Sequence, residues 1–176
     1  MRFLILGAGA IGAYVGGSLA LAGQHEVVFF VRPDTAAALH STGLTLQMGG
    51  EIRRIASPAT VTGVEEFLAC GPYDAAVLAV KSYDTRSVLE PLTPWRDRFP
   101  PLLCLQNGVE NEALIASLLG EERVIPGSVT TSVSRPSPGL IRVERLRGVA
   151  IAAGYPLSQP LAEAFEAAGL HPQLCR

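Results

Sequence analysis

Residues 2–12 read RFLILGAGAIG, and this stretch decides the fold. Residues 3–6 are continuously apolar, which is typical of a short strand in a parallel sheet whose two faces are both covered. The pattern G-x-G-x-x-G follows at residues 7–12, and residues 10–22 then read as a buried helix of small residues that ends before Gly23. The chain therefore opens with a strand, a glycine loop and a helix.

Each glycine of the loop has a separate mechanical role in this pattern. Gly7 permits the tight turn out of the strand, Gly9 lets a pyrophosphate approach the backbone, and Gly12 allows close packing of helix on strand. The loop N–H groups and the positive end of the helix dipole then attract phosphate. A tight turn without a ligand is the alternative interpretation. The candidate cofactor-binding residues are Gly7, Ala8, Gly9, Ala10, Ile11 and Gly12.

The alternation of strands and helices continues along the chain and predicts an α/β fold. We expect a single Rossmann-type dinucleotide-binding domain over residues 1–176, with a doubly wound, mainly parallel sheet and antiparallel hairpin additions. Gly49-Gly50 indicates a hairpin between strands at 44–48 and 52–56. The other expected strands are 26–31, 75–80, 102–106, 124–133, 140–143 and 148–153. The other expected helices are 33–40, 64–70, one that follows Ser82 or Asp84 and stops before Pro91 or Pro94, 110–119 and 157–168.

Composition excludes several classes of protein. The 176 residues carry 14 Lys+Arg against 16 Asp+Glu, a net charge of −2, so a strongly basic nucleic-acid surface is not expected. The three cysteines form neither a CxxC motif nor a Cys/His cluster, which argues against a metal site and for a reducing, cytoplasmic compartment. Residues 3–23 carry no charge, but six glycines interrupt them, so a signal peptide or membrane span is disfavoured.

The end of the second expected strand bears on the choice of dinucleotide. An enzyme that uses NAD usually has an acid there, about 20 residues past the glycine fingerprint, to bind the ribose 2′-hydroxyl. This chain has Arg32, whose guanidinium can pair with a 2′-phosphate, so NADP(H) is the predicted cofactor. Asp34 is close in sequence, and a surface ion pair between Arg32 and Asp34 is the alternative.

Polar residues also follow two other expected strands. Lys81 comes after residues 75–80 and could hold a carboxylate or a cofactor ribose, whereas Asn107 comes after 102–106 and offers both a donor and an acceptor. Because ligands of open α/β sheets lie beyond the carboxyl ends of the strands, both are candidate site residues. A solvated lysine and an ordinary Asn-Gly turn are the alternatives.

These residues together resemble the ketopantoate reductase (2-dehydropantoate 2-reductase) family. The resemblance rests on GAGAIGAYVG at 7–16, Val31-Arg32, AVK at 79–81, QNGV at 106–109 and Pro138-Gly139. It implies NADPH-dependent reduction of a 2-oxo acid to a 2-hydroxy acid in pantothenate biosynthesis. It further implies that Arg32 binds the 2′-phosphate, Lys81 lies beside the nicotinamide half, Asn107 touches both cofactor and substrate, and Ser134 lies near a further cofactor contact.

The chain departs from this family in one respect. Family members have a second, helical domain, which supplies a lysine proton donor and begins about where this sequence ends. Lys81 is the only lysine here, so we expect residues 1–176 to bind cofactor, to contain no catalytic residue, to be inactive alone and to self-associate weakly through the face of the missing domain.

Three other readings of the sequence stay open. The first is a stand-alone NADP-binding or sensing module without catalysis. The second is another dehydrogenase of hydroxyacid or opine type, which shares the glycine fingerprint. The third is a flavoprotein fragment, which predicts an acid where Arg32 stands.

Overall fold

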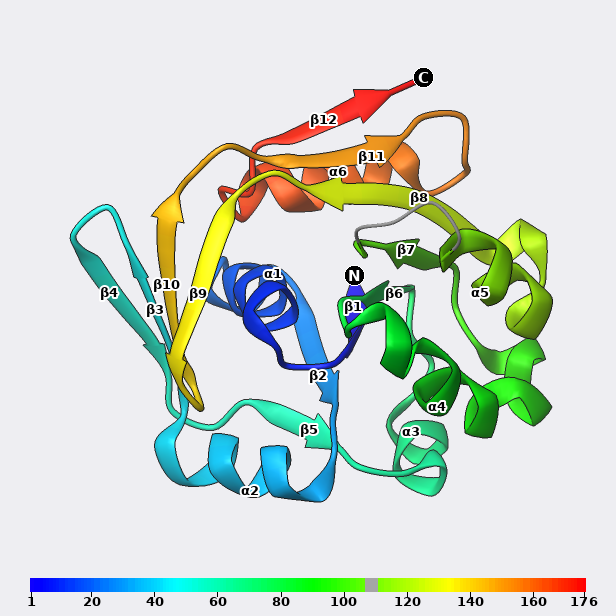
Figure 1. Cartoon of the computed structure of the whole chain (residues 1–176), viewed down its shortest axis with the longest axis horizontal. Helices are drawn as coiled ribbons and strands as arrows, with labels where there is room; N and C mark the ends of the chain where they lie inside the picture. The colour runs from blue at the N-terminus through cyan, green and yellow to red at the C-terminus, as the bar shows by residue number, and fades with distance from the viewer. Residues whose placement is uncertain (107–110) are drawn as a thin grey trace.

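The computed structural model describes residues 1–106 and 111–176. Within these residues the main sheet has eight strands in the order β12-β11-β8-β7-β6-β1-β2-β5 (Figure 1). The strands from β5 to β8 run parallel, while β11 is antiparallel to β8. The bounds are β1 Arg2–Leu6, β2 Glu26–Phe30, β5 Ala59–Val61, β6 Ala75–Leu78, β7 Leu102–Cys104, β8 Val124–Val129, β11 Val149–Ala152 and β12 Pro172–Cys175. The predicted doubly wound, mainly parallel sheet is confirmed.

Helices cover both faces of this sheet, which explains why its central strands are apolar throughout. Phe3 and Ile5 of β1 pack into a core shared with α1 and α6, whereas Leu4 and Leu6 pack into a second core with α3, α4 and α5. The helices are α1 Ala10–Leu21, α2 Pro33–Thr42, α3 Val64–Cys70, α4 Thr85–Leu89, α5 Asn111–Leu119 and α6 Ser158–Ala167, with 3-10 segments η1 Ser82–Asp84, η2 Glu90–Arg98 and η3 Glu121–Arg123.

A second sheet lies against α1 on the side away from β1, in the order β4-β3-β10-β9 (Figure 1). The expected hairpin forms β3 Leu44–Met48 and β4 Glu51–Ile55, and β10 Leu140–Arg145 pairs with β3 in parallel and with β9 Ser132–Ser137 in antiparallel. The hairpin is therefore part of a separate layer that encloses α1. Gly17 permits this packing, because a Cβ there would lie 2.7 Å from Leu46 Cδ1.

The expected continuous strand at 124–133 is wrong in one detail, since it is split between the two sheets. The chain leaves β8 at Val129 and enters β9 at Ser132. Between them, the Thr130 amide donates to the Gly148 carbonyl at 3.0 Å, and the Thr131 hydroxyl accepts from the Gly148 amide at 2.9 Å. These bonds hold a corner at which the backbone changes sheet.

Two strands and one 3-10 segment also differ from the expectation. The edge strands β5 and β12 are short, and β12 begins with a proline, so neither has a clear strand pattern in sequence. The α-helix after Lys81 ends at Leu89, before Pro91 as predicted, and the chain goes on as the unexpected 3-10 segment η2, with a kink at Trp95. None of the helices in the described residues has the length and apolar character needed to cross a bilayer.

Candidate functional site

The glycine loop lies where the direction of winding of the main sheet reverses. β1 has β2 on one side and β6 on the other, and this point is where open α/β sheets bind ligands. The amide of Gly7 donates to the Phe30 carbonyl at the end of β2 at 3.0 Å, and the Ala79 amide donates to the Leu6 carbonyl at 3.2 Å. The loop is therefore anchored to both neighbouring strand ends.

Two of the three glycines are required by the packing of the protein itself. Gly7 has φ +95°, and a Cβ there would lie 2.5 Å from Val80 Cγ1. A Cβ on Gly12 would overlap the carbonyl oxygen of Gly7 and lie 3.3 Å from Ala79 Cβ. The roles assigned to Gly7 and Gly12 from the sequence, a tight turn and close helix packing, agree with this geometry.

Gly9 differs from its neighbours because a side chain there would not collide with the rest of the protein. The nearest atom that a Cβ on Gly9 would meet is the carbonyl oxygen of Ala79, at 3.9 Å. Gly9 is also the N-cap of α1: its carbonyl accepts from the Ala13 amide at 2.9 Å, but it has no side chain to accept from the free N–H groups of the first turn. These donors and the helix dipole face a space that the absence of a Cβ keeps clear, which suits an anion.

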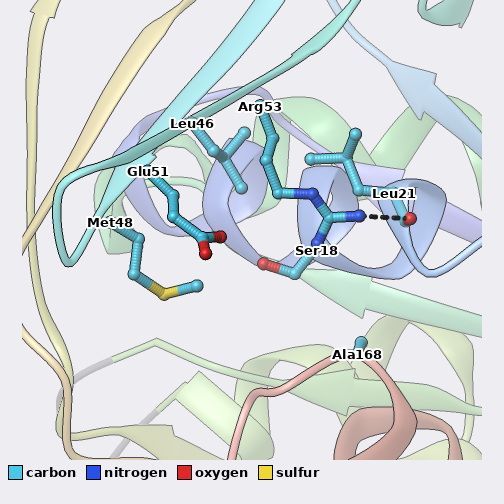
Figure 2. Close-up of a pocket in the computed structure, with 7 residues that line it drawn as sticks. All are labelled: Ser18, Leu21, Leu46, Met48, Glu51, Arg53 and Ala168. Atoms are coloured by element: carbon cyan, nitrogen blue, oxygen red, sulfur yellow. Dashed lines mark hydrogen bonds between the residues drawn. The ribbon is translucent and has the colours of Figure 1, made fainter.

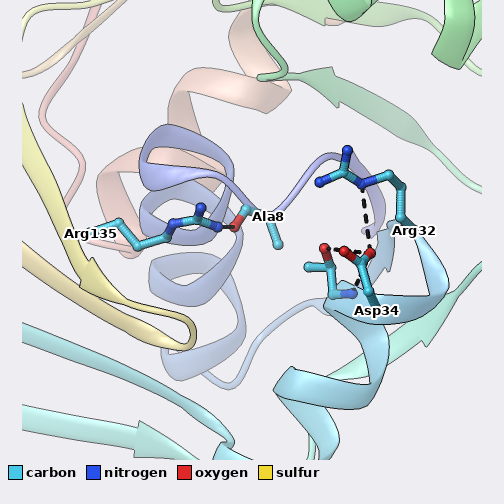
Figure 3. A network of polar contacts seen from close by, with 5 residues as sticks. Ala8, Arg32, Asp34 and Arg135 are labelled. Atoms are coloured by element: carbon cyan, nitrogen blue, oxygen red, sulfur yellow. Dashed lines mark hydrogen bonds and ion pairs between the residues drawn. The ribbon is translucent and has the colours of Figure 1, made fainter.

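Arg32 lies at the end of β2 and is the N-cap residue of α2. Its Nε is 3.6 Å from Asp34 Oδ1, and both side chains are strongly exposed, at 82% and 73%. Asp34 Oδ1 also accepts from the Thr35 amide at 2.8 Å. Figure 3 shows the terminal nitrogens of Arg32 pointing away from Asp34. The ion pair between Arg32 and Asp34, which was the alternative interpretation of the sequence, is therefore present. It occupies only the Nε edge of the Arg32 guanidinium.

A second arginine reaches the loop from the other sheet. Arg135 of β9 donates from Nη1 to the Ala8 carbonyl at 3.4 Å. In the view of Figure 3, Arg135 and Arg32 lie on either side of the loop at Ala8. The sequence analysis missed Arg135, because no local motif connects two positions that are 127 residues apart.

Lys81 is exposed directly after the end of β6, and a buried glutamine holds the backbone beside it. Gln106 Nε2 donates to the Val80 carbonyl at 2.8 Å and lies 2.8 Å from the hydroxyl of Thr85, which is fully buried. The ends of β6 and β7 are thus tied together, so Gln106 positions the segment that carries Lys81. In the sequence, the polar residues that follow two predicted strands indicated a site here. They did not show that Gln106 is the residue that positions the segment of Lys81.

Cys104 lies at the end of β7 near Gln106, and its thiol is fully buried. Burial is the main reason why the pKa of the Cys104 thiol is raised to about 11, and the nearby Glu112 adds to the rise. At neutral pH the group is therefore a neutral thiol with no nucleophilic role.

The cofactor contacts predicted for Asn107 and Ser134 are not tested by the structure. Asn107 lies outside the described residues, so its cofactor and substrate contacts stay a prediction. Ser134 lies on β9, where its hydroxyl donates to Glu144 Oε1 on β10 at 2.6 Å. Its role near the cofactor also stays a prediction, while its neighbour Arg135 makes the contact with the glycine loop.

Two pockets lie away from the glycine loop. One of about 20 Å³, room for about one water, lies at the far end of α1 among Ser18, Leu21, Ala168 and the β3–β4 hairpin (Figure 2). There Arg53 Nη2 donates to the Leu21 carbonyl at 2.7 Å and so caps the last turn of α1. A second, open pocket lies at the opposite ends of the strands, beside Arg2 and His25. In the described residues no three His, Cys, Asp or Glu side chains are placed to hold a metal ion.

Comparison with known proteins identifies relatives over nearly the whole chain. The profile of a family described as ketopantoate reductase PanE/ApbA matches residues 3–155. The 2-dehydropantoate 2-reductase of Pyrococcus horikoshii is 33% identical over 99% of this chain and 56% of its own length. A crystal structure of a PanE/ApbA family ketopantoate reductase from Ralstonia eutropha superposes with a TM-score of 0.84 at 32% identity, covering 99% of this chain and 56% of that one.

A more distant structure shares the fold alone. A ternary complex of D-mandelate dehydrogenase with NADH and anilino(oxo)acetate has a TM-score of 0.81 at 21% identity, over 99% of this chain and 57% of that one. The chain spans about half the length of the curated relatives it matches.

Proposed function

Because the chain belongs to the ketopantoate reductase PanE/ApbA family, we propose that it binds NADP(H) and forms the cofactor-binding part of a 2-oxo acid reductase. The reaction is the reduction of 2-dehydropantoate, or a 2-oxo acid like it, to the 2-hydroxy acid. The observation that carries the proposal is the glycine loop at the reversal point of the sheet, in which Gly7 and Gly12 are packed tightly and Gly9 faces open space.

The residues present suit a dinucleotide. A pyrophosphate would meet the N–H groups of the loop and of the first turn of α1 beside Gly9, at the positive end of the helix dipole. The open direction at Gly9 is what this approach needs, since an added Cβ would project into it. Lys81 and Asn107 would contact the nicotinamide half, and Ser134 would contribute a further cofactor contact.

The preference for NADP(H) over NAD(H) rests on Arg32. Its guanidinium is exposed at the end of β2, where a ribose 2′-substituent would lie, and one edge is turned away from Asp34. A 2′-phosphate could pair with the remaining donors, and it would compete with the exposed carboxylate of Asp34 only for the edge at Nε. An exposed ion pair is weak, so a phosphate carrying more charge is expected to displace it.

The bound cofactor supplies the hydride, and the protein contributes orientation and charge control. The loop at 7–12 and the end of β6 fix the cofactor across the strand ends, while Gln106 holds the Val80 carbonyl and hence the backbone of Lys81. Reduction of a ketone also needs a general acid within about 3 Å of the carbonyl oxygen. Lys81 is the only lysine of the chain and is assigned to the cofactor, so we expect these 176 residues alone to bind NADPH without steady turnover.

A non-catalytic NADP-binding or sensing module is the second candidate. The open loop and the exposed Arg32 favour it as much as they favour a reductase, since both concern binding alone. The three unpaired cysteines suit a reducing, cytoplasmic compartment in either case.

Calorimetric titration of the purified chain with NADP⁺ and NAD⁺ tests the binding proposal. We expect saturable binding of both, with NADP⁺ the tighter. The second measurement mixes the chain with NADPH and 2-dehydropantoate and follows the absorbance of the reduced nicotinamide. Steady turnover on the order of 1–10³ s⁻¹ would contradict the expected inactivity, and no binding of either dinucleotide would contradict the function itself.

A further inference from the structure

Arg135 is an exposed, charged residue of β9 whose side chain contacts the glycine loop. Val133 packs against the core around α1, and the register of β9 with β10 shifts between Ser134 and Ser137, where Arg135 lies. From this irregularity the Arg135 guanidinium reaches the glycine loop and meets the Ala8 carbonyl.

The contact with Ala8 uses only one of the N–H donors of the Arg135 guanidinium. It is a single, long hydrogen bond of 3.4 Å from Nη1, whereas a guanidinium carries five N–H donors. Arg135 is also exposed, so its side chain is not locked by packing. Ala8 directly precedes Gly9, whose open side is the space in which a phosphate would lie.

The two strands on this side of the loop are rich in positive charge. Residues 132–147, which form β9, β10 and the segment after them, contain four arginines and one glutamate in a chain whose net charge is −2. Glu144 lies against Ser134 on the outward face, and Arg142 of β10 donates to Gln47 of β3 at 3.2 Å. Arg135 is the arginine of this group whose side chain contacts the loop.

We propose that Arg135 binds the pyrophosphate of the cofactor, so that the second sheet closes one side of the phosphate site. This inference rests on the proposed function, because it needs the loop at 7–12 to bind a dinucleotide. The two arginines then have different roles: Arg32 binds the 2′-phosphate and so selects NADP(H), whereas Arg135 contributes equally to the affinity for NADP(H) and NAD(H). Binding exchanges the long bond to the Ala8 carbonyl for charge-assisted bonds to phosphate oxygens.

The test measures affinities of the 176-residue chain for four probes: NADP⁺, NAD⁺, ADP and adenosine 2′-monophosphate. ADP has the pyrophosphate without the 2′-phosphate, and adenosine 2′-monophosphate has the reverse. We expect Arg135→Ala to weaken NADP⁺, NAD⁺ and ADP about 10-fold, within the range for a charge-assisted bond, and to change adenosine 2′-monophosphate by less than about 2-fold. Arg32→Ala should instead weaken NADP⁺ and adenosine 2′-monophosphate and leave NAD⁺ and ADP nearly unchanged.

Two further variants separate phosphate binding from a structural role. Arg135→Gln keeps an uncharged N–H donor on a shorter side chain, so it should bind as weakly as Arg135→Ala. Arg142→Ala removes an outward-facing arginine of the same group and should bind like the parent chain. Melting temperatures measured alongside report any loss of structure.

The possible outcomes distinguish this inference from the proposed function. Parent-like affinity in Arg135→Ala, recovery of affinity in Arg135→Gln, or an equal loss for ADP and adenosine 2′-monophosphate would overturn the role of Arg135 alone. A parent chain that binds neither dinucleotide would overturn the proposed function, and the role of Arg135 with it.

Discussion

The missing side chain of Gly12 makes room for the carbonyl oxygen of Gly7. A Cβ on Gly12 would overlap that oxygen and would lie 3.1 Å from the Gly7 carbonyl carbon. The two atoms of Gly7 that the added Cβ would meet both belong to the backbone, so no side chain can move aside to relieve the clash. The start of α1 can therefore approach the end of β1 only while residue 12 is glycine, and this approach sets the depth of the loop between β1 and β6.

Substitutions at Gly12 and Gly9 should have different effects: the first mainly on stability, the second mainly on cofactor binding. We expect Gly12→Ala to lower the free energy of unfolding by about 3 kcal/mol or more, because overpacking against backbone has no cheap relaxation. Gly9→Val should cost about 1 kcal/mol in stability, through a poorer N-cap, and should abolish NADP⁺ binding because the side chain fills the open space. Urea unfolding and calorimetry of both variants make the comparison. A folded Gly9→Val chain that binds NADP⁺ like the parent would show that the loop is a structural turn.

Arg32 should control the preference between the two dinucleotides. Arg32→Ala is expected to weaken NADP⁺ by about 1.5–3 kcal/mol and to leave NAD⁺ nearly unchanged, because one charge-assisted bidentate pair is lost. Asp34→Asn is the matched control: it removes the competing carboxylate of the ion pair and should strengthen NADP⁺ slightly. Calorimetry gives both affinities. An equal loss for NADP⁺ and NAD⁺ in Arg32→Ala would exclude a role in 2′-phosphate recognition.

Gln106 and Thr85 should behave as one coupled unit. Gln106→Leu leaves the Val80 carbonyl and the buried Thr85 hydroxyl without their partner, so we expect a loss of about 1–3 kcal/mol in the free energy of unfolding. Thr85→Val removes the second partner, and the double variant should lose less than the sum of the two single losses by at least about 0.5 kcal/mol. Urea unfolding of the three variants measures this difference, and strictly additive losses would rule out the coupling.

His25 should make the stability depend on pH. Burial lowers the pKa of His25, and the N-terminal ammonium lowers it further. That ammonium lies 3.2 Å from His25 Nδ1 and can only donate, so the contact requires a neutral imidazole. The unfolded chain therefore binds a proton more readily than the folded one. The stability contributed by His25 is complete above the unfolded pKa of about 6.5 and is lost as pH falls through the lower, folded value.

The measurement for His25 compares unfolding free energies at pH 8 and pH 5 in the parent chain and in His25→Asn. We expect the decrease toward pH 5 to be smaller in the variant, because asparagine does not titrate. An unchanged pH dependence would assign the effect to other groups.

The sequence by itself determined the class of fold and the first half of the site. The motif at residues 7–12 lies between an apolar strand and a helix of small residues, and these features are local, so neighbouring residues suffice to specify them. The uninterrupted apolar strands likewise predicted a sheet covered on both faces, as β1 confirms through its two cores. Arg32 could be identified because its distance from the loop is fixed by one helix and one strand.

Only the tertiary structure decided how distant segments meet. Nothing local indicates that the hairpin at Leu44–Met48 pairs with β10, or that the chain changes sheets after Val129, because strand partners are selected by packing around α1. The contact between Arg135 and Ala8 depends on the same packing, since it joins positions 127 residues apart. Periodicity does not place Arg135, because the register of β9 shifts there, and only the arrangement of the two sheets around α1 brings its side chain to the glycine loop.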